Sequence, residues 1–101
     1  MKKNYVLYLG RNIPNTKQEV SLENFVEFLN SQSLLQSFTI FDAKGFWHGE
    51  FEKTFVIEVF GIEPEKIDQF AELYCTTFDQ EDVLIKEINV NVNLLRGELH
   101  E

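Results

Sequence analysis

Four side chains that could take part in chemistry stand close together in the middle of the chain. Trp47 and His48 are adjacent, and Glu50 and Glu52 follow at alternate positions. A histidine beside carboxylates can bind a metal ion or transfer a proton. The spacing matches no standard zinc-ligand set, and one histidine without a second makes a poor metal site. We therefore predict no metal and no cofactor, and take Trp47 and His48 as candidates for binding a ligand or a partner.

Trp47 permits two interpretations. A structural tryptophan would pack back on Phe46, Phe51 or the strands and fix the hairpin, since aromatic side chains bury a large area. An exposed tryptophan would instead contact a partner, because tryptophans dominate the energy of many interfaces. Gly45 and Gly49 flank the tip and let it curl inward, which favours the structural interpretation.

Two further side chains are reactive types in less informative positions. Arg11 follows Gly10 at the end of an apolar run, where it would either hold an anion beside the hairpin or form an ordinary surface ion pair. Cys75 is the single cysteine, so an intrachain disulfide and a zinc–cysteine cluster are both excluded. The sequence contains no phosphate-binding loop, nucleophile elbow or zinc-protease motif, and we expect a protein that is not an enzyme.

The elements that would position these side chains follow from the hydrophobic periodicity. Apolar residues alternate over 5–9, 38–43, 54–60 and 83–94, which predicts strands. Ser21 is a good N-cap for a helix with apolar residues at 22, 25, 26 and 29, and Pro64 fits the first turn of a second helix. Between 43 and 54 we predict a long loop with an aromatic tip. The tail 96–101 has no pattern and is expected to fray.

This order is β-α-β-β-α-β within a single domain, 1–101. It predicts an α+β fold, the ferredoxin-like plait, with two helices on one face of a four-stranded antiparallel sheet. Right-handed crossovers give the strand order 4-1-3-2.

One face of such a sheet is left uncovered, and here it would be apolar. The side chains expected on it are Val6, Tyr8, Phe41, Val56 and Phe60. A contiguous apolar patch usually marks an interface or a ligand cleft. We therefore predict a homodimer formed through the open face. The alternative is a small enzyme or small-molecule-binding protein with a cleft near the aromatic hairpin tip.

The net charge of −8 narrows the range of partners. An acidic chain is repelled by nucleic acid and by anionic lipid, so neither is expected to bind. No apolar run approaches the length of a membrane span, which favours a cytoplasmic protein. The acidic surface suits a basic partner protein. It is therefore compatible with an inhibitor, for example an anti-defence protein encoded by a mobile element or a phage.

In four segments the chain resembles an uncharacterised family of small bacterial domains: LYLGRNIP, VSLENFVEFLN, FTIFDAKGFWHG and EKTFVIEVFG. That family reads approximately L-Y-F-G-x-x-x-P, V-S-x-x-x-W-x-x-F and L-T-V-x-D-x-x-G-x-W. An apolar strand follows, and then a helix ending in F-G-Q-(E/D)-x-V-L, here FDQEDVL. The similarity runs from Tyr8 to Val92. Phe25 stands where the family often has tryptophan, and Asp79 where it has glycine. The resemblance implies the plait and supplies no activity.

Overall fold

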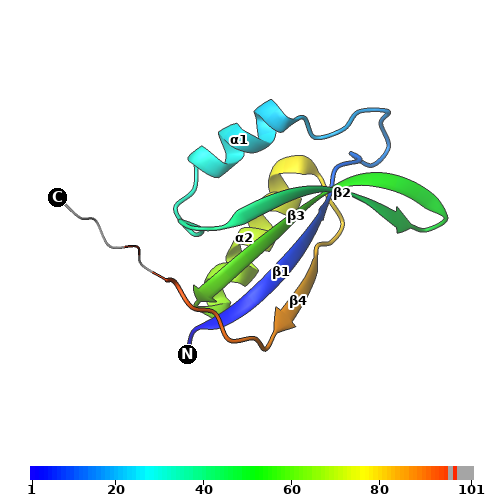
Figure 1. The fold of residues 1–101 in the computed structure, drawn as a ribbon. Helices are drawn as coiled ribbons and strands as arrows, with labels where there is room; N and C mark the ends of the chain where they lie inside the picture. The colour runs from blue at the N-terminus through cyan, green and yellow to red at the C-terminus, as the bar shows by residue number, and fades with distance from the viewer. Residues whose placement is uncertain (96, 98–101) are drawn as a thin grey trace.

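The computed structural model describes residues 1–95 and 97 and has the predicted order of elements, β-α-β-β-α-β (Figure 1). In chain order these elements are β1 Lys3–Gly10, α1 Leu22–Asn30, β2 Thr39–Trp47, β3 Glu50–Ile62, α2 Pro64–Phe78 and β4 Leu84–Ile88. The frayed tail predicted for 96–101 lies, apart from Gly97, outside the described residues.

The strands form one antiparallel sheet in the order β2-β3-β1-β4, which is the predicted order read from the opposite edge. The two central strands are therefore β3 and β1. Leu7 lies opposite Ile57 on β3 and Ile85 on β4. Since side chains alternate along a strand, this register fixes which residues share each face of the sheet.

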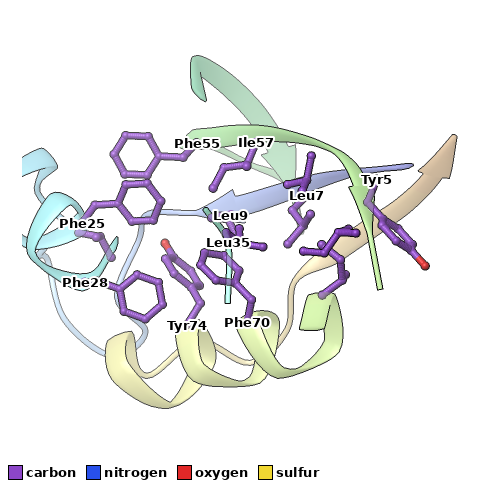
Figure 2. Close-up of a cluster of buried hydrophobic side chains, with 14 residues drawn as sticks. Tyr5, Leu7, Leu9, Phe25, Phe28, Leu35, Phe55, Ile57, Phe70 and Tyr74 are labelled. Atoms are coloured by element: carbon purple, nitrogen blue, oxygen red, sulfur yellow. The ribbon is translucent and has the colours of Figure 1, made fainter. Parts of the chain in front are cut away.

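Both helices contribute to a single core on one face of the sheet (Figure 2). Phe25 and Phe28 come from α1, and Phe70 and Tyr74 come from α2. The ring of Phe25 stacks on that of Phe55 of β3, with centroids 4.3 Å apart. The sheet residues in this core are Tyr5, Leu7, Leu9, Phe55, Ile57, Val59 and Ile62. We call this the covered face, and the other the open face.

The helix ends follow the sequence signals, with one exception in backbone conformation. The Ser21 side chain accepts a hydrogen bond from the Asn24 amide at 3.0 Å, and Pro64 occupies the first turn of α2. Helix α2 ends at Asp79, whose φ is +55°. Glycine is the usual residue at this left-handed position. Asp79 therefore has a backbone conformation that is strained for a residue with a side chain.

The hairpin between β2 and β3 differs from the predicted long aromatic loop. Pairing continues to Trp47 opposite Glu50, and the connection is the two-residue turn His48–Gly49. Both residues have positive φ, +48° and +83°, as a tight hairpin turn with the twist of its strands requires. The loop prediction was wrong because Gly45 was taken as a turn residue, whereas it lies within β2.

The last strand is shorter than the predicted one. β4 ends at Ile88, and residues 89–95 follow without strand pairing. The alternation of Asn89, Asn91 and Asn93 with apolar residues was read as strand, but pairing depends on a neighbouring strand as well as on the pattern.

Candidate functional site

The candidate site is a recess on the open face, at the end of the sheet nearest the β2–β3 hairpin. Its volume is about 630 Å³. It is lined by Tyr8, Gly10, Asn12, Pro14, Trp47, His48, Glu50, Glu52, Gln80, Glu81, Asp82, Val83 and Leu84. We refer to this set as the recess. It joins the end of β1, the hairpin and the segment between α2 and β4, which lie far apart in the sequence.

The turn after β1 forms the floor of the recess, and three side chains hold it in place. The Tyr74 hydroxyl, reaching from α2, donates to the Gly10 carbonyl at 2.7 Å. The backbone N–H of Asn12 donates to a Glu52 carboxylate oxygen at 2.7 Å, and the Gln80 side chain donates to the backbone carbonyl of Asn12 at 2.8 Å. This network links the recess directly to the covered face.

Gly10 is required at this point for steric reasons. A Cβ on Gly10 would lie 2.8 Å from the Glu52 carboxylate oxygens. The close approach of Glu52 to the β1 backbone therefore depends on the absence of a side chain at position 10.

Trp47 forms one wall of the recess. It packs on β2 over Gly45, where a Cβ would overlap the indole Nε1. Phe46 and Phe51 pair with each other, with centroids 5.0 Å apart, on the other side of the hairpin. Trp47 thus packs on its own strand, as one part of the structural interpretation expects. It does not contact Phe46 or Phe51, because side chains alternate along the strand and these two lie on the other face.

The indole nitrogen of Trp47 has no hydrogen-bond partner although it is buried. A buried donor without a partner is unfavourable, so the packing of this ring on Gly45 is not fully optimised. The ring itself is only half-buried, and its remaining surface faces the recess.

The charge of the recess is negative. Glu50, Glu52, Glu81 and Asp82 line it, and among the described lining residues none is lysine or arginine. The ammonium of Lys86 lies 5.6 Å from the centre of the Tyr8 ring, at the margin. Aromatic faces and carboxylates both attract cations. The arrangement suits a positively charged group with an apolar stem.

Arg11 does not belong to the recess. Its guanidinium lies over the Phe55 ring, 4.3 Å from the centroid, and its Nε donates to the Val20 carbonyl at 2.9 Å. Both partners are part of the core on the covered face, and the nearest carboxylate oxygen, on Asp42, is 4.0 Å away. The alternative of an anion site at Arg11 is therefore not favoured, because its Nε is bonded to Val20 and its Nη1 faces the Asp42 carboxylate.

The other predicted site residues lie together on the open face. Tyr8 pairs with Val56 and with Leu84, and Val56 pairs with Phe41, so these side chains form a row across all four strands. Phe41 is 47% exposed and Phe60, further along β3, is 40% exposed. Val6 is buried on this face. Tyr8, Val56 and Phe41 thus form a row with the recess at one end, and Glu58 lies between Val56 and Phe60 along β3.

Two groups on α2, Tyr74 and Cys75, have raised pKa values. Burial, and then the charge of Glu52, raises the pKa of Tyr74, which keeps its hydroxyl protonated as a donor. Burial, followed by the charge of Asp82, raises the pKa of Cys75, which makes a thiolate nucleophile unfavourable. No cluster of three or more His, Cys, Asp or Glu among the described residues is arranged to hold a metal ion.

The sequence pointed to one part of the recess and missed another. Trp47, His48, Glu50 and Glu52 were singled out from their spacing, and all line it. Glu81 and Asp82 carry no comparable signal, because they stand in the connection between α2 and β4. Their approach to the hairpin follows from the pairing of β4 beside β1, and the predicted strand order contained that information.

Comparisons with protein-family models, with curated proteins and with solved structures gave no match. The resemblance to the family of small bacterial domains therefore stays a prediction. Neither of the two helices is long and apolar enough to cross a membrane, within the part of the chain that the structure describes.

Proposed function

We propose that this protein is a cytoplasmic protein-interaction module whose recess takes a basic side chain of a partner protein. The proposal rests on one observation above all. Four carboxylate side chains and two aromatic ones, Tyr8 and Trp47, line the same recess. We take the fold to be the ferredoxin-like plait, in which an open sheet face is a common place for binding.

The chemistry of the recess favours arginine or lysine as the inserted group. The aliphatic stem would lie along Tyr8 and Trp47, and the charged end would reach Glu50, Glu81 or Asp82. A cation near an aromatic face contributes about 0.5–1 kcal/mol when exposed and more when desolvated. The position of Lys86 beside Tyr8 already shows a cation at the margin.

The rest of the chain supports a protein partner with a basic surface. The net charge of −8 gives a long-range attraction that speeds encounter with a positively charged partner. An inhibitor that occupies a basic site, such as an anti-defence protein, would use these features. The alternative occupant is a small organic cation, since the recess volume lies within the range of small-molecule sites.

Binding of a labelled arginine–glycine peptide, followed by fluorescence anisotropy, tests the proposal. The test variant carries Glu50→Gln, Glu81→Gln and Asp82→Asn. Three exposed charge interactions of about 0.5–1 kcal/mol each predict at least roughly tenfold weaker binding. The control variant has the same change in net charge on the helices, Glu23→Gln, Glu27→Gln and Glu72→Gln, and should bind almost as well as the wild type.

The outcomes separate the possible occupants. A peptide in which citrulline replaces arginine should lose binding, because the shape is kept and the charge is removed. Saturation by arginine amide with the affinity of the peptide would favour the small-molecule alternative. If the recess variant and the helix variant lose peptide binding equally, only the net charge of the protein matters, and the proposal is contradicted.

Self-association through the open face is a second proposed function, favoured by the exposure of Phe41 and Phe60. Face-to-face contact of two sheets would cover these rings, and we propose a homodimer of this kind. Light scattering at micromolar concentration tests it. Phe41→Glu should abolish this face-to-face contact and lower the mass, whereas Leu22→Glu, at an exposed position on α1, should leave the mass unchanged. A wild type that is monomeric throughout would contradict the homodimer.

A further inference from the structure

The segment after β4 has the pattern of a strand without a partner strand. Residues 89–95 read Asn-Val-Asn-Val-Asn-Leu-Leu, which is a strict alternation up to Leu94. The segment passes the start of β1, near the N-terminus, and then leaves the sheet (Figure 1), and Val92 and Leu94 are 50% and 98% exposed. We call residues 89–95 the terminal segment.

The register of β4 explains why the terminal segment is unpaired within its own chain. β4 pairs with β1 as far as Ile88 opposite Asn4, and β1 begins at Lys3. In this register only Asn89 would still find a strand residue opposite. Beyond Asn89, the terminal segment is joined to β1 by a hydrogen bond of 3.4 Å from the Asn4 side chain to the Val90 carbonyl.

The other free edge of the sheet is out of reach. β2 lies three strand positions from β4, about 14 Å away at a spacing of ~4.8 Å. Seven extended residues span roughly 23 Å. Crossing the sheet would use most of this length and leave too little to pair along β2. A strand partner must therefore come from another molecule.

The charges of the two edges show where a second molecule can approach. Edge strands are usually protected from pairing by charged side chains. The edge strand β2 carries Asp42 and Lys44, and the edge strand β4 carries Lys86 and Glu87, but the stretch 88–95 has no charged residue, in a chain with a net charge of −8. Two copies of this acidic protein therefore meet least repulsion at the terminal segment.

The terminal segment is also complementary to itself. In an antiparallel pair related by a two-fold axis, asparagines lie beside asparagines on one face and Val90, Val92 and Leu94 lie together on the other. Asparagine side chains both donate and accept, so identical amides can pair. We propose that residues 89–95 form an antiparallel strand pair with the same segment of a second copy, which joins two sheets edge to edge.

This inference does not rest on the proposed functions. The recess lies beside Leu84 at the opposite end of β4, and the edge contact leaves the open face free. It also differs from the face-to-face dimer in the residues on which it depends.

Sedimentation equilibrium of the full chain tests the edge contact with the substitution Val92→Lys. A two-fold axis brings the two new charges close together, and we expect dimerisation to weaken roughly tenfold or more. The substitution lies outside the helices and strands, so the thermal midpoint should not change at concentrations where both proteins are monomeric. Leu73→Lys, at an exposed position on α2, is the matched control and should dimerise like the wild type.

A second variant, Asn91→Pro, removes a backbone donor and a side-chain amide in the same segment, and should also weaken the dimer. Phe41→Glu should leave the edge contact intact. A wild type that remains monomeric up to about 1 mM, or a Val92→Lys variant that dimerises as tightly as the wild type, would overturn the proposal. Loss of the dimer in Phe41→Glu alone would assign it to the open face instead.

Discussion

The two faces of the sheet are both rich in apolar side chains, but only one of them is covered. On the covered face Leu7, Leu9 and Ile57 are completely buried beneath the helices, whereas on the open face Phe41 and Phe60 keep much of their surface exposed. Alternate residues of the same strands thus serve different purposes. The covered face contains most of the buried core, and the open face keeps apolar and charged side chains such as Phe41, Phe60 and Glu50 exposed.

The largest expected effect comes from removing one aromatic ring from each face of the sheet. Phe55→Ala would remove a ring stacked on Phe25 in the core and should destabilise the protein by about 3–5 kcal/mol. Phe41→Ala, on the open face, should cost less than about 1 kcal/mol because the ring is half exposed. Chemical denaturation of both variants measures the two values. Similar losses would show that the open face also contributes to the core.

A medium effect is expected at the boundary between the faces, where Trp47 packs on Gly45. Gly45→Ala would force the indole out of its place, because the new Cβ overlaps Nε1. Trp47→Ala should cost about 2 kcal/mol, since the ring is only half-buried. The single tryptophan makes fluorescence a direct measure, and Gly45→Ala should shift its emission to the red. An unchanged spectrum would mean that the strand does not confine the ring.

Much of the fold was predictable from local signals. The alternation in β1, the Ser21 cap and Pro64 each depend on neighbouring residues, and each was read correctly. The position of the hairpin turn was predicted wrongly, because Gly45 provides space for the Trp47 ring and does not bend the chain. The end of β4 depends on the register with β1, which no local pattern contains.

The recess was less predictable than the fold. Its hairpin residues are close in sequence, but Glu81 and Asp82 reach them only through the order of the strands. The direction of Arg11 was also hidden, because a strand end leaves both faces open to a long side chain. Its position over Phe55 is decided by packing.

A smaller effect links the covered face to the floor of the recess. Tyr74→Phe would remove the hydrogen bond to Gly10 and should cost about 0.5–1.5 kcal/mol. Because the pKa of Tyr74 is raised in the folded protein, its phenol contributes stability fully below the ordinary value of 10.0, and loses it as the pH rises above that value. Stability of Tyr74→Phe should therefore fall less steeply above pH 10. The free energy of unfolding is measured by denaturant titration at several pH values. Parallel pH dependences for the wild type and Tyr74→Phe would contradict this role.

The smallest expected effect is a gain. Asp79→Gly places glycine at the left-handed end of α2 and should stabilise the protein by about 0.5–1 kcal/mol. His48→Gly relieves the same kind of strain in the hairpin turn, and should also raise the thermal midpoint slightly. Neither change touches the core, so a loss of stability in Asp79→Gly would mean that its side chain makes a favourable interaction.

The claim that the open face is the binding face is tested most directly by nuclear magnetic resonance. Backbone amides and the single indole N–H are followed while the arginine–glycine peptide is added. We predict that the indole of Trp47 and the amides of Tyr8 and Leu84 shift most, and that the amides of α1 stay in place. Shifts that are confined to the helices, or spread evenly over the surface, would contradict the account.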